Sequence, residues 1–317
     1  YSFIRNHFDS KKALGISFFT ALLFAIHPVQ VETVCWISAS KIVLSTFFYL
    51  SALICYIQYM RNSKWQYLLA SVVSSILAMG CKEQSVIIVP CLLLFDWMLF
   101  KRNMRSLKVY IEKVYYLIPA IAIFIVTLVA NKDTGEEIIG YTIVDRFIFL
   151  CYSVFKYLLI SAIPFKLSYL YPFPFQVGEK IPMALWIYPF VILFIGYVIY
   201  LNRRKPLLVF CTLFFILHLL PVLHVIPLPR YVVAADRYLY IPYIAFAIGL
   251  SILSYHLYER QRKWILYAGF LYCSYLCIYT ADYAPAWKNS DTLKEHFKEV
   301  LKKRETNLSI NYKNEKQ

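Results

Sequence analysis

Polar side chains that could carry chemistry lie in clusters at the ends of long apolar runs. In the first cluster, His27 and Glu32 flank Pro28. As a pair they could transfer protons or bind the hydroxyls of a sugar, although helix-end capping explains His27 equally well. In the second cluster, Lys82 and Glu83 lie in a short turn between two apolar runs. Ionisable groups so close to hydrocarbon are usually paired or functional. Lys82 could therefore hold a lipid phosphate that Glu83 orients, or the two could form an ion pair that closes a helical hairpin.

A third cluster combines Asp145 and Arg146 with the aromatic and proline-rich stretch 167–174. Proline interrupts helices because it lacks the backbone N–H and clashes with the preceding turn. This stretch therefore predicts an extended lid that lies on a membrane surface.

The fourth cluster contains Asp236 and Arg237, followed by Tyr238 and preceded by Arg230. A guanidinium fork matches the oxygens of a phosphate, so Arg237 is the best candidate in the chain for holding one. Asp236 could instead pair with Arg237 or cap a helix. If the four clusters meet on one side of a membrane, their cations suit an isoprenoid phosphate, and their carboxylates and aromatic rings suit a sugar or an acceptor.

The elements that must position these clusters are predicted to be membrane helices. Of the 317 residues, 60% are hydrophobic and 16% are charged, and a membrane span needs about 20 apolar residues. The predicted fold is an all-α polytopic membrane helix bundle. Its nine predicted spans are 13–28, 41–60, 65–80, 86–100, 114–130, 183–201, 207–223, 239–257 and 264–281.

The charged links between these segments predict which side of the membrane each one faces. Lys and Arg gather in alternating links, around residues 5–12, 61–64, 101–113, 203–205 and 260–263. The positive-inside rule places these links in the cytoplasm. The net charge of +15 is thus explained without a nucleic acid partner, and the four clusters fall on the opposite side.

One apolar segment, 147–164, does not fit this alternation as a simple span. We expect it to be interfacial or re-entrant, with Lys156 reaching the headgroups; the alternative is a true span, which would reverse the side of everything after it. The chain then divides into a membrane domain, 1–281, and a polar external tail, 282–317, which could begin a tetratricopeptide repeat region.

Other polar residues have simpler explanations. Asp96 lies close to Lys101 and Arg102 near a predicted cytoplasmic end, where a local ion pair accounts for it. The eight cysteines lie mostly in apolar runs and form no CxxC motif, so no metal site is predicted.

Stretches from all four clusters also resemble a known family. The stretches HPVQVE (27–32) and ADRYLYIP (235–242), with CKEQS (81–85) and LSYLYPFP (167–174), are similar to multi-pass GT-C-like proteins with C-terminal tetratricopeptide repeats. That family includes transmembrane O-mannosyltransferases that target cadherins, and bacterial homologues. The similarity runs from about Ala13 to Trp287. The chain departs from the family at 39–42, where Ala-Ser-Lys-Ile stands in place of Gly-Arg-Lys-Asp.

The resemblance implies transfer of a sugar, with mannose as one candidate, from a polyprenyl-phosphate carrier to protein Ser or Thr on the non-cytoplasmic side. It implies no cofactor in the chain; the partners would be membrane lipid, the lipid-linked donor and a protein acceptor. Arg237, Lys82 and Arg230 would bind the lipid phosphate. His27, Glu32, Glu83, Asp236 and Tyr238 would line the pocket. The family's catalytic acid is expected upstream of Tyr1, so we expect an N-terminally truncated fragment that is inactive alone.

Two other classes of protein stay open at this point. One is a non-catalytic membrane anchor or scaffold for a repeat domain, and the other is a transporter of lipid-linked sugars. The Lys-, Ile- and Tyr-rich composition favours a bacterial inner membrane over the endoplasmic reticulum as its location.

Overall fold

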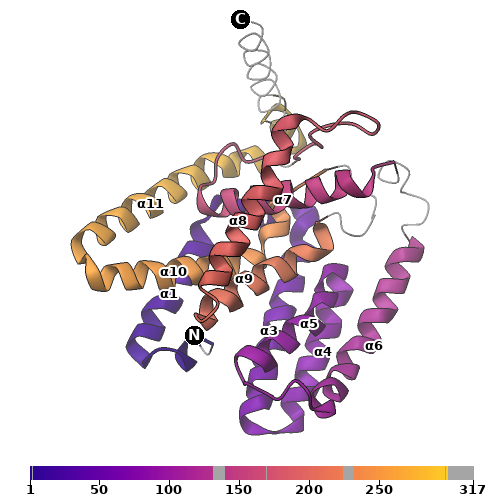
Figure 1. Ribbon diagram of the computed structural model, residues 1–317, viewed down its shortest axis with the longest axis vertical. Coiled ribbons are helices and arrows are strands. Elements are labelled where there is room, and N and C mark those ends of the chain that lie inside the picture. The colour runs from indigo at the N-terminus through magenta and orange to yellow at the C-terminus, as the bar shows by residue number, and fades with distance from the viewer. Residues whose placement is uncertain (2, 131–139, 169, 224–231, 297, 299–317) are drawn as a thin grey trace, which may run out of the picture.

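The computed structural model describes residues 1, 3–130, 140–168, 170–223, 232–296 and 298 (Figure 1). This part of the chain is all-α, as the sequence predicts, and its extended pairing is an isolated antiparallel bridge between Tyr171 and Ala234. Besides the long helices there are short 3-10 helices: η1 (Ile4–Asn6), η2 (Pro28–Gln30), η3 (Ile37–Ala39), η4 (Glu83–Ile87), η5 (Met183–Trp186), η6 (Leu220–Val222), η7 (Asp236–Leu239) and η8 (Ala284–Trp287).

Four helices of the first half run side by side: α3 (Ser40–Asn62), α4 (Trp65–Cys81), α5 (Ile88–Met98) and α6 (Leu107–Ala130) (Figure 1). The tightest connection joins α3 to α4. Ser63 ends α3 in the left-handed conformation, with φ of 54°, and donates its N–H to the carbonyl of Tyr59. This is a common way to satisfy the last carbonyls of a helix and reverse the chain.

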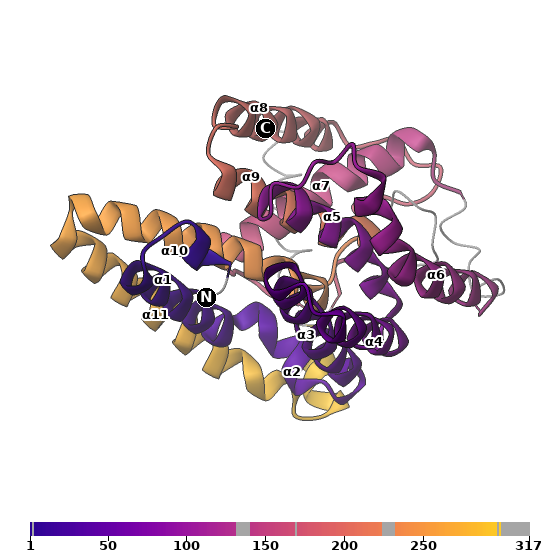
Figure 2. The ribbon, with the colours of Figure 1, turned by 90° about the horizontal axis from the view of Figure 1, so that it is seen from below.

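The remaining helices build the other part of the bundle. Figure 2 shows α1 (Ser10–Ile26), α10 (Pro242–Arg260) and α11 (Arg262–Tyr283) grouped on one side of the molecule, with α3, α4 and α6 on the other. Helix α9 (Pro206–Leu219) packs on both α5 and α10, and α8 (Ile187–Leu201) packs on α7 (Ile143–Ala162). Helix α1 ends before Pro28, and the short α2 (Val31–Cys35) continues after a bend of 56°.

All ten apolar segments identified in the sequence contain a helix. Within the described residues, four stretches are long and apolar enough to cross a membrane, namely 37–62, 107–130, 183–201 and 262–287, and a bent fifth comprises 10–26 and 28–35. The helices at 65–81 and 206–222 are apolar but shorter, and α5 has only 11 residues. For the shorter and more polar of the nine segments, a membrane span thus stays a prediction.

The outward faces of the longest apolar helices carry large apolar side chains. Ile125 on α6 is 54% exposed, Phe194 on α8 is 66% exposed and Phe270 on α11 is 71% exposed. Apolar surface of this extent is characteristic of contact with lipid or with another protein. The structure is therefore compatible with a membrane protein.

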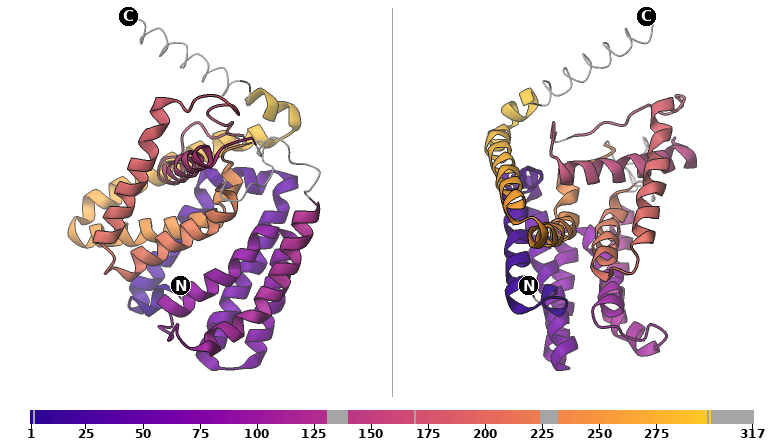
Figure 3. Two further views of the ribbon diagram at one scale, coloured as in Figure 1. Left: turned by 45° about the vertical axis from the view of Figure 1, so that its right-hand side comes forward. Right: turned by 60° about the vertical axis from the view of Figure 1, so that its left-hand side comes forward.

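Contacts between the helix ends agree with the predicted alternation of sides. Lys12 pairs with Glu259 at 2.8 Å, and both belong to links predicted to be cytoplasmic. The links that are predicted to be external also contact one another, as described below. Helix α7, which contains the ambiguous segment, lies across the direction of α3, α4 and α6 (Figure 3) and is not among the candidate spans. An interfacial position for it stays a prediction.

Candidate functional site

The centre of the candidate site is an ion pair between Glu32 and Arg237. Glu32 lies in the first turn of α2, and Arg237 lies in η7. The Glu32 carboxylate accepts a hydrogen bond of 2.7 Å from the Arg237 backbone N–H and a second from its guanidinium. Glu32 is fully buried, whereas the Arg237 side chain is 18% exposed. Burial raises the pKa of Glu32, and the charge of Arg237 opposes that shift.

The Arg237 guanidinium also lies over two aromatic rings. Its central carbon is 5.5 Å from the centre of the Trp36 ring and 5.1 Å from that of Tyr238. Cations over aromatic faces are attracted by the ring quadrupole. Trp36 and Tyr238 therefore help Glu32 to hold the guanidinium in place.

Lys82 brings the second cluster to the same place. It follows the end of α4, and its ammonium lies 5.6 Å from the centre of the Tyr238 ring. The residue is only 9% exposed, and within the described residues its ammonium donates no hydrogen bond and has no carboxylate within ion-pair distance; Glu83 acts on it only through its charge. Burial lowers the pKa of Lys82 to about 7. A largely buried ammonium without a carboxylate at ion-pair distance is a costly arrangement.

Asp236 points elsewhere than the sequence suggested. It does not pair with Arg237; its Oδ1 accepts a hydrogen bond of 2.8 Å from the Tyr171 hydroxyl. Its Oδ2 is buried and makes no hydrogen bond with the described residues. Burial raises the pKa of Asp236 well above its usual value, and the charge of Glu32 raises it further. This carboxyl therefore favours its protonated form more than an exposed aspartate does.

Tyr171 and α7 hold the fourth cluster in place. The Tyr171 carbonyl accepts a hydrogen bond of 2.9 Å from the N–H of Val233. On α7, Ser153 donates to the carbonyl of Val233 at 3.1 Å, and the Lys156 ammonium lies 4.8 Å from the centre of the Tyr171 ring. The sequence assigned Lys156 to the headgroup region and did not place it, or Tyr171, next to Asp236.

The other residues predicted for the site have different positions. His27 is buried and caps η2, since its Nδ1 accepts a hydrogen bond from the N–H of Val29 at 3.3 Å; its ring lies 4.3 Å from that of Tyr243. Capping thus accounts for Nδ1 of His27, whereas its Nε2 is buried and makes no hydrogen bond with the described residues; a role of His27 in the pocket stays a prediction. Glu83 is exposed, and Arg230 lies outside the described residues. Asp145, from the third cluster, serves in a capping box at the start of α7.

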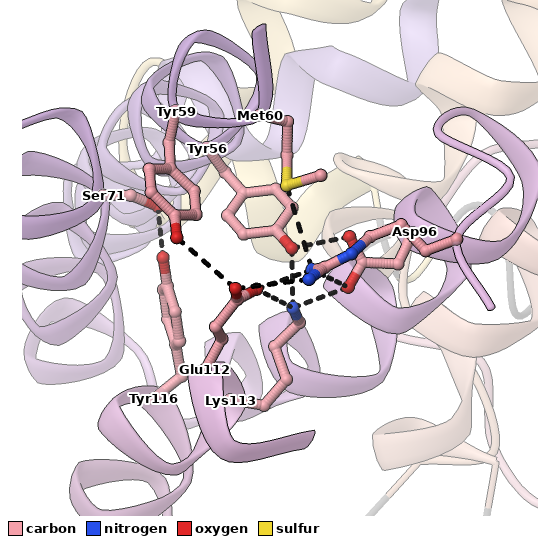
Figure 4. Close-up of polar contacts among 9 residues, drawn as sticks. Tyr56, Tyr59, Met60, Ser71, Asp96, Glu112, Lys113 and Tyr116 are labelled. Atoms are coloured by element: carbon pink, nitrogen blue, oxygen red, sulfur yellow. Dashed lines mark hydrogen bonds and ion pairs between the residues drawn. The ribbon is translucent and has the colours of Figure 1, made fainter. Parts of the chain in front are cut away.

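A second buried ionic cluster lies at the opposite ends of α3, α5 and α6 (Figure 4). The Asp96 carboxylate accepts hydrogen bonds of 2.6 Å from both Tyr56 and Lys113, and Arg102 lies 3.4 Å away. Arg102 also forms hydrogen bonds with both oxygens of Glu112. Arg102 was expected as a partner of Asp96, but the closest cation, Lys113, was not. The charges balance and the groups are paired, so this cluster is suited to joining helices rather than to binding a ligand.

The described residues contain no group of three or more His, Cys, Asp or Glu side chains that could hold a metal ion. In the comparisons with known proteins, no family model, no curated protein and no solved structure matches the chain. The resemblance to the GT-C-like family therefore stays a prediction from the sequence motifs.

Proposed function

We propose that this chain belongs to a membrane glycosyltransferase of GT-C type, in which the Glu32, Lys82 and Arg237 cluster binds the phosphate of a polyprenyl-phosphate-linked sugar. The sugar would be transferred to Ser or Thr of a protein on the non-cytoplasmic side. The polar segment from residue 282 onward would lead into repeats that present this acceptor.

The state of Lys82 is the observation that carries the proposal. The residue is largely buried, and among the described residues no carboxylate lies within ion-pair distance of its ammonium, while the neighbouring Arg237 already pairs with Glu32. Arg237 and Lys41 further disfavour the charged form of Lys82, and Glu83 and Glu32 favour it. A phosphate placed between Lys82 and Arg237 would supply the missing negative charge and restore the ordinary pKa of the lysine.

The surroundings of the cluster favour a lipid over a soluble phosphate. The cluster lies where candidate spans end, next to Trp36 and Tyr238, and such aromatic side chains are enriched at the headgroup level of a bilayer. A lipid phosphate would occupy this level while its hydrocarbon chain stays among the helices or in the bilayer.

In the proposed reaction, the acceptor hydroxyl attacks the anomeric carbon of the sugar, and the bond between that carbon and the phosphate oxygen breaks. A carboxylate takes the proton of the hydroxyl, and the lipid phosphate leaves with the electron pair. Lys82 and Arg237 would stabilise the charge that develops on the phosphate. The base is not assigned to a residue of this chain.

The test is a transfer assay with the full-length protein in proteoliposomes, a radiolabelled polyprenyl-phospho-mannose and a peptide rich in Ser and Thr. We expect label in the peptide, lost with Arg237→Ala and retained with Arg203→Ala, which removes an exposed arginine from a cytoplasmic link. Absence of transfer with a panel of lipid-linked sugars would contradict the enzymatic proposal and favour a scaffold.

A further inference from the structure

The segment that follows α11 makes direct contact with the candidate site. Trp287, in η8, is 8% exposed, and its ring lies 5.9 Å from that of Trp36. Tyr283, at the end of α11, lies 6.3 Å from Trp287 on another side. Trp287 therefore contacts both the end of α11 and Trp36, which follows the first polar cluster.

Trp36 links this contact to the ionic centre. The guanidinium of Arg237 lies over the Trp36 ring, at 5.5 Å from its centre, and its Nη1 donates to Glu32. The rings and charges therefore form one continuous series, from Trp287 through Trp36 to Arg237 and Glu32. A change in the position of Trp36 would therefore alter its contact with Trp287 or its contact with the Arg237 guanidinium.

The chain beyond Trp287 is fastened to the same region. The Asn289 side chain accepts hydrogen bonds from the N–H groups of Asp291 and Thr292, at 3.0 and 2.8 Å, and so begins a new helical turn. Leu293 of that turn packs against the main apolar core, and His296 lies 5.3 Å from the ring of Tyr283. The polar segment thus starts at the site rather than at a distance from it.

We propose that Trp287 is a positioning residue, which couples the docking of residues 288–296 to the position of the Arg237 guanidinium in the candidate site. The inference rests on the proposed function for the identity of the ligand, whereas the contacts that connect Trp287 with Arg237 belong to the protein itself. Through this contact, a protein bound to the polar segment would change the affinity of the anion site, and an anion would tighten the docking of the segment.

Two readouts test the coupling in the detergent-solubilised full-length protein. The first is the dissociation constant for farnesyl phosphate. The second is the rate at which trypsin cleaves after Lys288, which is exposed next to Trp287, with cleavage after Lys263 at the far end of α11 as the internal reference. The variants are Trp287→Ala, the milder Trp287→Phe, and Arg237→Gln. The matched control is Trp264→Ala, which removes an indole that is 74% exposed.

We expect farnesyl phosphate to slow cleavage after Lys288 in the wild-type protein but not after Lys263. Trp287→Ala should weaken farnesyl phosphate binding about fivefold or more, a usual size for coupling between sites, and Trp287→Phe should weaken it less. Without ligand, Arg237→Gln should speed cleavage after Lys288, although it lies on the far side of Trp36. Trp264→Ala should change neither readout.

The coupling would be overturned if Trp287→Ala bound farnesyl phosphate as tightly as the wild type, or if Arg237→Gln left the Lys288 cleavage rate unchanged. Failure of the proposed function looks different. In that case the wild type binds no farnesyl phosphate, while Arg237→Gln still speeds cleavage after Lys288, and the coupling stands with a different ligand.

Discussion

The carboxylate of Glu32 and the guanidinium of Arg237 form a buried ion pair between residues 205 positions apart in the chain. Glu32 also accepts a hydrogen bond from the Arg237 backbone, so the pair fixes the main chain of η7 as well as one side chain. This ion pair holds the first and fourth polar clusters together, and the position of Arg237 in the candidate site depends on it.

Removal of the Glu32 charge should weaken the fold. Glu32→Gln leaves the guanidinium largely buried beside a neutral side chain, and breaking a buried ion pair in this way costs about 3–5 kcal/mol. The free energy of unfolding from SDS titration in mixed micelles measures the loss. Glu295→Gln, at an exposed position, is the control and should stay close to wild type; equal stability of the two variants would contradict the importance of the pair.

Lys82 should make ligand binding depend on pH. Because burial lowers its pKa to about 7, the empty site loses its ammonium as the pH rises through 7. Affinity for a farnesyl phosphodiester, whose own charge is constant in this range, should fall by up to about tenfold per pH unit above 7. Lys82→Arg keeps a permanent charge and should flatten the profile. A flat profile for the wild type would show that Lys82 does not contact the anion.

The lowered pKa of Lys82 also determines the direction in which the stability of the fold changes with pH. Between pH 7 and the ordinary pKa of lysine, the unfolded chain binds the Lys82 proton and the folded chain does not. Stability should therefore rise with pH across this window through Lys82. Lys82→Met should reduce that rise, and an SDS titration at pH 7 and pH 9 compares the two proteins. If stability rises between pH 7 and pH 9 as much in Lys82→Met as in the wild type, groups other than Lys82 cause the rise.

The ionic cluster around Asp96 should stabilise the opposite end of the bundle without affecting ligand binding. Asp96→Asn leaves Lys113, whose side chain is 4% exposed, without its closest carboxylate. We expect a loss of about 3–5 kcal/mol in the SDS titration and an unchanged affinity for farnesyl phosphate. Asp282→Asn, at an exposed position, is the matched control. A drop in affinity with Asp96→Asn at full stability would give this cluster a direct functional role.

Opposite ends of the bundle should face opposite sides of the membrane. In a protein without native cysteines, Glu83→Cys and Asn289→Cys should react with a membrane-impermeant maleimide in intact cells. Ser63→Cys and Arg203→Cys should react only after the cells are permeabilised. Labelling of Glu83→Cys and Ser63→Cys from the same side would refute the predicted topology.

The sequence predicted the elements well because apolar runs, proline and charged links are local signals. Every apolar segment became a helix, and Pro28 ends α1 where expected. The partners of charged groups were harder to predict, because they depend on contacts between distant segments. Asp236 and Arg237 are adjacent in sequence, yet successive residues of a 3-10 helix point about 120° apart, so one reaches Tyr171 and the other Glu32.

The contacts of Lys156 and Lys113 were not predicted for a similar reason. Lys156 belongs to a segment that the sequence left ambiguous, and its contact with Tyr171 follows only once α7 is placed across the bundle. Lys113 was assigned to a cytoplasmic link by the charge count, whereas its position on α6 directs it to Asp96 on α5. The rarity of an unpaired buried charge was the only sequence signal for this pairing.

The most direct test of the account is the affinity of the full-length protein for farnesyl phosphate in phosphatidylcholine nanodiscs. Lys82→Met is compared with Lys205→Met, which removes an exposed lysine at the other end of the bundle, and farnesol and inorganic phosphate serve as competitors. We expect Lys82→Met to weaken binding about tenfold or more, equivalent to about 1.4 kcal/mol, and Lys205→Met to have no effect. Neither competitor alone should match farnesyl phosphate. Equal affinities of the wild type and Lys82→Met would contradict this account.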